Sequence, residues 1–124
     1  KAELRAWVEA GIASIEAKER RAAVGMVSDA YVDGRGNERS DLDAILRVYF
    51  HRMNNIKLLP KIEEITIYDD TAAQLVLTVG MAGTNDGILG FSADAYRFEL
   101  EVEKHGSDWR LISARWGEIG GELR

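Results

Sequence analysis

Apolar residues in the first half of the chain recur every three to four positions, the spacing typical of amphipathic helices. Residues 2–20 predict one such helix and residues 41–55 a second, with residues 22–28 as a short helical piece between them. Residues 29–38 contain Asp-Gly and Gly-Asn pairs, which favour positive φ and therefore predict a short extended segment that runs into a turn.

The second long helix carries signals at both ends. Ser40 or Asp41 can cap the free amides of its first turn. Asn54-Asn55 and then Pro60 are expected to end it, because proline cannot continue a helix.

After Pro60 the apolar period changes from helical spacing to two, which indicates β-strands. Residues 62–68 and 72–82 predict a hairpin, residues 94–104 a third strand and residues 109–119 a fourth. Helices followed by hairpin-linked strands are typical of an α+β domain in which the helices pack on one face of an antiparallel sheet.

The last predicted strand has large apolar residues at both odd and even positions, which would face opposite sides of the sheet. Trp109 and Leu111 would share one face, and Ile112, Ala114 and Trp116 the other. A strand that is apolar on both faces usually has both faces covered. Because the helices can cover only one, we expect a second subunit on the other face and hence a homodimer; a covering loop or an exposed edge tryptophan is the alternative.

Composition narrows the class of protein. The chain has 124 residues, 46% apolar and 30% charged, which suits a single domain over residues 1–124. A net charge of -5 argues against nucleic acid or an anionic membrane surface as a partner. The sequence has no cysteine and only two histidines, so we expect neither a metal centre nor a cofactor. No apolar run approaches the roughly 18–20 residues of a membrane span.

The order of these elements, the stretch SDAYVD at 28–33 and the ending GSDWRLISARW at 106–116 resemble the NTF2-like superfamily, the cones of the SnoaL and ketosteroid isomerase type. The resemblance covers nearly the whole chain. It implies an α+β cone in which N-terminal helices pack on a curved antiparallel or mixed sheet, with a pocket between them.

More narrowly, the chain is similar to small exported NTF2-like lipoproteins of gammaproteobacteria. This resemblance implies a periplasmic or otherwise exported protein. The start at Lys1 would fit a removed signal peptide and lipid-bearing cysteine.

Members of this superfamily use the pocket as enzymes, as binding modules or not at all, so the fold alone does not decide the function. We take seven residues as candidates for lining a ligand pocket, although apolar residues at such spacing also form ordinary cores. They are Trp7, Tyr31, Asp33, Tyr49, Met53, Phe98 and Trp116.

Asp33 is a weak candidate for a catalytic base, because it lies near the position where the resembling isomerases place theirs, and Tyr31 could hydrogen-bond there. Those isomerases carry a donor tyrosine on the first helix, where this chain has Ala10. Asp33 would equally serve the Asp-Gly turn, and Asp29 would cap or tie the short helix. We therefore assign no catalytic residue.

Other chemistry is less well supported. His51 and His105 are expected at the surface, which disfavours a dehydratase-like His–Asp site and a two-histidine metal site. Arg97 and Arg115 could hold an anion or belong to a cross-strand charge ladder. Residues 83–90, GTNDGILG, lack the Gly-Lys-Ser/Thr ending of a phosphate loop and predict a mobile loop at the mouth of the cone.

We therefore expect a non-catalytic domain that binds a small, largely apolar molecule or acts as an accessory part of an exported protein. One alternative is a structural or protein-interaction domain whose cone is filled by its own side chains. Another is an isomerase, cyclase or dehydratase that uses Asp33 as general base.

Overall fold

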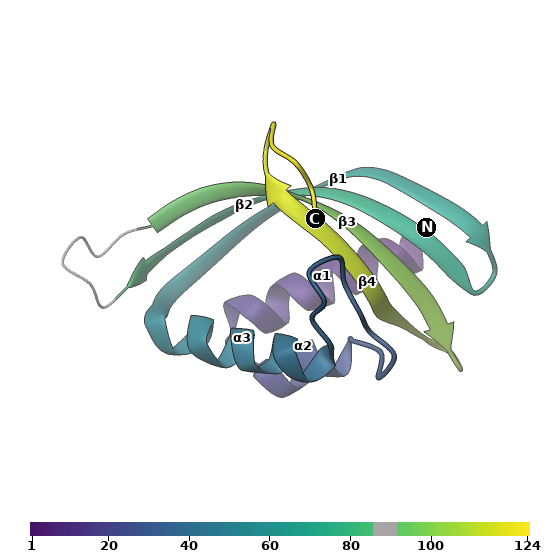
Figure 1. The fold of residues 1–124 in the computed structure, drawn as a ribbon, viewed down its shortest axis with the longest axis horizontal. Helices are drawn as coiled ribbons and strands as arrows, with labels where there is room; N and C mark the ends of the chain where they lie inside the picture. The colour runs from purple at the N-terminus through teal and green to yellow at the C-terminus, as the bar shows by residue number, and fades with distance from the viewer. Residues whose placement is uncertain (86–91) are drawn as a thin grey trace.

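The structure, a computed structural model, describes residues 1–85 and 92–124, and in them three helices pack on one face of a curved four-stranded sheet (Figure 1). The helices are α1 (Ala2–Glu16), α2 (Arg20–Gly25) and α3 (Arg39–Arg52). The strands are β1 (Met53–Asp69), β2 (Ala72–Asn85), β3 (Ser92–His105) and β4 (Asp108–Glu118). Neighbouring strands are antiparallel in the order β1-β2-β3-β4, which confirms the α+β prediction.

The start of α3 differs from the prediction. The N-cap is Glu38, and its backbone N–H donates a hydrogen bond of 2.8 Å to Oδ2 of Asp41. This is the return half of a capping box, in which the third helical residue reaches back to the cap. The predicted cap at Ser40 or Asp41 was therefore wrong, although Asp41 does satisfy an amide at this helix end.

The predicted break at Pro60 was also wrong. The helix ends at Arg52 and β1 begins at the next residue, so Pro60 lies inside a 17-residue strand. Because β1 is an edge strand, a proline there can lack its N–H without removing a hydrogen bond of the ladder. The predicted strand at 62–68 covered only the second half of β1, since the proline was taken as a boundary.

The two tight turns between strands follow the prediction. A turn at residues 70–71 joins β1 to β2. A second turn joins β3 to β4, and Gly106 there has a φ of 67°, which a glycine adopts without steric cost. Of the predicted loop at 83–90, residues 83–85 belong to β2, and residues 86–90 lie outside the described part of the chain.

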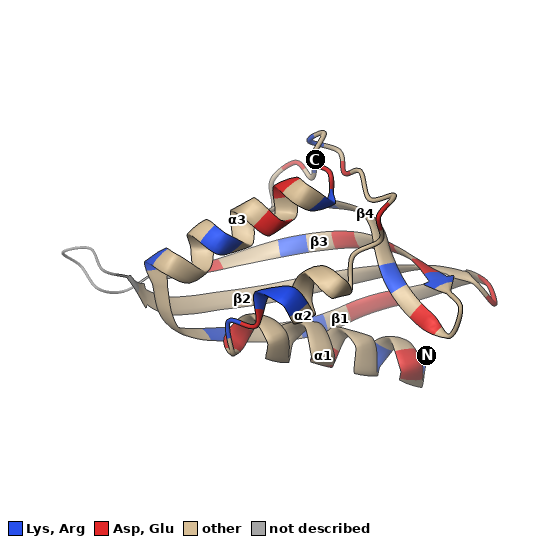
Figure 2. Cartoon of the chain, turned by 90° about the horizontal axis from the view of Figure 1, so that it is seen from below, with Lys and Arg blue, Asp and Glu red and all other residues tan. Residues whose placement is uncertain are grey.

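The face of the sheet toward the helices is apolar. Leu75 pairs with Leu100 and Leu77 with Phe98 across β2 and β3, as the alternating pattern predicts. These residues form the main core with Leu4 and other apolar residues of α1. No charged residue interrupts β2 along its whole length, and Figure 2 shows this uncharged strand running behind the helices.

A bulge in β4 changes which side chains face the helices. Leu111 and Ser113 pair with consecutive residues of β3, which leaves Ile112 without a partner. This extra residue shifts the alternation of side chains between the two faces by one position, so Ala114 and Trp116 lie on the same face as Leu111. Their assignment to the opposite face was wrong. The homodimer stays a prediction, but the distribution of apolar residues on β4 no longer supports it.

The free edge of β4 is covered by the chain itself. The connection between α2 and α3 lies along it, with the backbone N–H of Ser28 donating to the Leu111 carbonyl at 2.8 Å (Figure 1). Farther along, Trp116 and Arg124 exchange two backbone hydrogen bonds of 3.1 and 3.2 Å. Because the edge at β4 is covered, β1 is the edge of the sheet that stays open. Edge strands with unpaired amides invite association with other chains.

Candidate functional site

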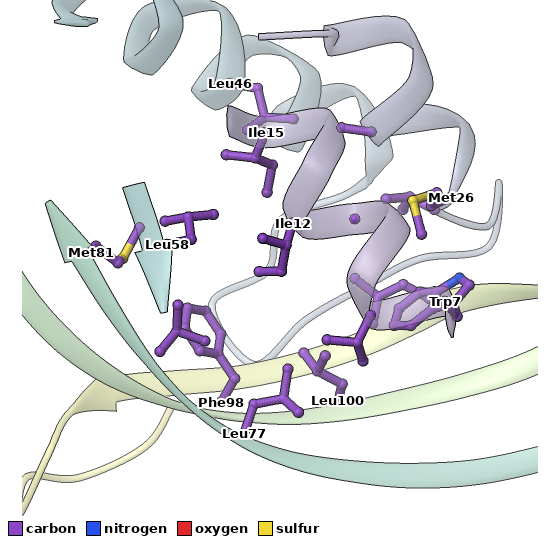
Figure 3. A pocket seen from close by; sticks show the side chains of 16 residues that line it. Trp7, Ile12, Ile15, Met26, Leu46, Leu58, Leu77, Met81, Phe98 and Leu100 are labelled. Carbon is purple, nitrogen blue, oxygen red and sulfur yellow. The ribbon is translucent and has the colours of Figure 1, made fainter. Parts of the chain in front are cut away.

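An apolar cavity of about 240 Å³ lies between the helices and the sheet (Figure 3). Trp7 and Met26 lie toward one end, and Leu58 and Met81 toward the other. Sixteen of the described residues line it: Trp7, Val8, Gly11, Ile12, Ile15, Ala23, Met26, Val27, Leu46, Leu58, Leu77, Val79, Met81, Phe98, Leu100 and Leu111.

Among the residues that the structure describes, the lining contains no ionisable or hydroxyl side chain. Its one polar side-chain atom is Nε1 of Trp7, and this N–H already donates to the Trp109 carbonyl at 3.1 Å. An apolar cavity offers water no hydrogen-bond partners, so it favours an apolar guest over solvent.

Local sequence explains why space remains here. Gly11 has no side chain and Ala23 has only a methyl group, so the helices approach the concave sheet without filling the gap. From α3 only Leu46 lines the cavity, and no residue of that helix is fully buried. The cavity therefore has one tightly packed wall, the sheet, and a more loosely packed cover.

Asp33 lies in a different place, inside the turn that precedes α3. Its side chain is buried, and Oδ1 accepts hydrogen bonds from the backbone N–H groups of Arg35 (2.9 Å) and Asn37 (3.0 Å). Oδ2 accepts from the Tyr31 hydroxyl (2.7 Å) and from Nδ2 of Asn37 (3.1 Å). Burial acts to raise the pKa of Asp33, but these hydrogen bonds outweigh it and hold the pKa below its usual value.

Tyr31 is the partner that ties this turn to the core. It is only 1% exposed and packs with Val27 and Ala114. Burial, followed by the hydrogen bond to Asp33 and its charge, raises the pKa of the Tyr31 hydroxyl, which stays a neutral donor. Neither Tyr31 nor Asp33 lines the apolar cavity. A carboxylate with four donors and a lowered pKa is a poor proton acceptor.

The remaining predicted pocket residues are spread over three places. Trp7 and Phe98 line the cavity. Trp116 stacks on Phe98 with ring centroids 6.5 Å apart, but it does not itself line the cavity. Tyr49 and Met53 line a separate, smaller hollow.

That second hollow has a volume of about 180 Å³. Its lining consists of Tyr49, Met53, Met81, Ala82, Asp94 and Tyr96. Sequence reasoning missed Asp94 as a site residue. The signal was available, since Asp94 has the same parity as the inward-facing Tyr96 and Phe98 of β3.

Other candidates lie away from both spaces. His51 and His105 are exposed. Arg97 is exposed, and Arg115 makes a salt bridge of 3.4 Å to Glu99, its cross-strand neighbour. Within residues 1–85 and 92–124, no cluster of three metal-ligating side chains occurs. None of the helices described is both long enough and apolar enough to cross a bilayer.

Comparison with known proteins identifies the fold. No protein-family model matches the chain, and no curated protein matches it by sequence. Solved structures do match over nearly the whole length. A ketosteroid isomerase-like protein from Erwinia carotovora atroseptica has a TM-score of 0.79 at 13% identity, covering 97% of this chain and 96% of that one.

Two further structures carry the superfamily's name. An NTF2-like superfamily protein from Salmonella enterica has a TM-score of 0.76 at 12% identity, covering 94% of this chain and 89% of that one. An NTF2-like protein of unknown function in nutrient uptake from Rhodospirillum rubrum has a TM-score of 0.73 at 16% identity, covering 94% and 98%. The chain therefore has the NTF2-like cone fold, and at these identities the likeness extends to the fold alone.

Proposed function

We propose that this domain binds a small, uncharged, largely apolar molecule in the cavity between helices and sheet and performs no chemistry on it. The observation that carries the proposal is the lining of sixteen residues, all without an ionisable or hydroxyl group. Apolar surface moved from water into such a space gains roughly 25 cal/mol per Å².

Volume limits the size of the ligand. An engineered apolar cavity of about 150 Å³ binds benzene, and sites for drug-sized molecules span about 300–1,000 Å³. A cavity of about 240 Å³ lies between these. We therefore infer a ligand about the size of two fused rings or a branched chain of similar bulk.

The geometry speaks against the two alternatives. An isomerase-type reaction, of the kind suggested by the ketosteroid isomerase-like neighbour, needs a base within hydrogen-bond reach of the ligand. Asp33 lies outside the cavity lining and is occupied by four donors. A purely structural cone would be filled by its own side chains, which the open volume disfavours.

Two further features of the proposal do not rest on the site: export, which the sequence resemblance implies, and a homodimer, which the apolar positions of the last strand predicted. We propose that the domain belongs to an exported protein, and that it forms a homodimer. Fractionation of cells that produce the full-length protein tests the first. Light scattering on a size-exclusion column tests the second, and a monomer at tens of micromolar would exclude the dimer.

The three methionines make a direct binding test possible. Met26 and Met81 line the cavity, whereas Met53 does not. In protein labelled with ¹³C at the methionine methyl groups, titration with 2-methylnaphthalene should shift the signals of Met26 and Met81 more than that of Met53. Equal small shifts of all three, or none, would contradict binding in the cavity.

A matched pair of variants on α1 supplies the control. Gly11→Leu places a side chain into the cavity and should weaken binding of 2-methylnaphthalene at least tenfold, because it occupies the ligand's volume. Ala10→Leu adds the same side chain at the neighbouring exposed position and should leave binding unchanged. Equal effects of the two variants would mean that the ligand lies elsewhere.

A further inference from the structure

The small hollow and the apolar cavity adjoin each other. Met81 lines both spaces. Across the ladder, Asp94 pairs with Met81 and Tyr96 with Val79, a further cavity residue. The ring of Tyr96 also lies 6.5 Å from that of Phe98, centroid to centroid. A molecule that extends from the cavity past Met81 would therefore meet Asp94 and Tyr96.

The inner face of β3 changes in polarity along this path. Its alternate residues run from Asp94 and Tyr96 beside the hollow to Phe98 and Leu100 in the cavity. Side chains at every second position of a strand share a face, so this order forms a gradient from charged to apolar. In Figure 3 the apolar part runs from Met81 past Phe98 and Leu100 toward Trp7.

The hollow has the chemistry of a site for a cation. Asp94 is the one charged residue of its lining, it is exposed, and it makes no salt bridge with another described residue. Two phenol rings, those of Tyr49 and Tyr96, share the lining with it. Aromatic faces and a carboxylate together attract ammonium groups.

Electrostatics link these groups. Burial raises the pKa of the Tyr49 hydroxyl, and Asp94 and then Tyr96 add to the shift by their charges. The Tyr49 hydroxyl is therefore within the field of the Asp94 carboxylate. Arg52 lines a shallow groove on α3 with Tyr49 and Met53, but it is not part of the hollow.

We propose that the natural ligand carries an ammonium group beside its apolar body, with the body in the cavity and the ammonium group between Asp94, Tyr49 and Tyr96. This inference rests on the proposed function and names the class of ligand: a primary or substituted amine on an apolar skeleton. The net charge of -5 favours a cationic ligand over an anionic one.

The test compares two probes with the same apolar body. One is neutral 2-methylnaphthalene, and the other is 2-naphthylmethylamine, which is protonated at neutral pH. The amine should bind about tenfold more tightly, as expected for an exposed ion pair with Asp94 together with a cation–π contact to a tyrosine ring. It should also shift the methyl signal of Met53, which lines the hollow, whereas the neutral probe should not.

Two variants assign the effect to Asp94. Asp94→Asn should abolish the preference for the amine and leave the affinity for 2-methylnaphthalene within twofold. Because Asp94 is exposed, this change should not impair folding. Glu103→Gln removes the same charge from an exposed position of the same strand and should retain the full preference.

The outcomes separate this inference from the proposed function. If the neutral probe binds in the cavity but the amine gains nothing, the ammonium subsite is excluded while the binding function stands. A preference that survives in Asp94→Asn, or that is lost equally in Glu103→Gln, would also overturn the assignment. If neither probe shifts Met26 and Met81, both proposals fail.

Discussion

Replacing Asp33 with alanine is the sharpest test of how this fold is held together. The carboxylate accepts four hydrogen bonds in the turn before α3, two from backbone amides and two from side chains. The substitution removes all four and leaves the hydroxyl of Tyr31 without its partner. We expect a large loss of stability, although Asp33 touches no ligand.

The expected loss can be worked from burial. Tyr31 is 1% exposed, so water cannot replace Asp33, and an unsatisfied buried donor costs about 1–3 kcal/mol. The amides of Arg35 and Asn37 are partly buried and can be hydrated in part, so they add less. The total is about 2–4 kcal/mol, a sizeable share of the roughly 5–15 kcal/mol by which a domain is stable.

Urea unfolding followed by tryptophan fluorescence measures this free energy. Asp29→Ala is the matched control, because Asp29 is four residues away and its salt bridge with Arg39 is at the surface. It should cost at most about 1 kcal/mol. Equal losses for the two variants, or a loss below about 1 kcal/mol for Asp33→Ala, would refute the buried network. Folded Asp33→Ala should still bind 2-methylnaphthalene.

Acid should destabilise the wild type more than the Asp33→Asn variant, because folding lowers the pKa of the Asp33 carboxyl. A group of this kind stabilises the fold fully at a pH above its pKa in the unfolded chain, and this stabilisation is lost as the pH falls through its pKa in the folded protein. Urea titrations at about pH 7 and about pH 3 test this; parallel responses contradict it. Gly11→Ala should raise the unfolding free energy by about 0.5–1 kcal/mol, seen as a higher Tm. Gly117→Ala should speed amide exchange in residues 119–124, because its Cβ would overlap the Glu122 carbonyl; unchanged exchange contradicts it.

Much of the fold follows from local pattern. The change from helical spacing to alternation places the helices before the strands, and the alternation on β2 and β3 orients the residues that form the core. The turn around Asp33 is also local, since its partners Tyr31, Arg35 and Asn37 lie within four residues. Such features depend on backbone conformation and hydrogen bonds between near neighbours, which a sequence specifies directly.

The prediction was wrong at the positions where the local structure depends on how strands pair in the sheet. Nothing in the sequence of β4 marks Ile112 as the extra residue, because a bulge is defined only by the pairing with β3. Pro60 is tolerated because β1 has a neighbour on one side only, which is a property of the whole sheet.

The sequence by itself determined the type and order of the elements, the inward face of β2 and β3 and the class of fold, because periodicity and turn chemistry are short-range properties. The tertiary structure alone decided that a cavity remains beside Gly11 and Ala23, because free volume depends on side chains from three helices and the sheet together. It also brought Tyr49 beside Asp94, which the chain separates by more than forty residues. Contacts of that kind depend on how α3 and β3 pack and are invisible in any local pattern.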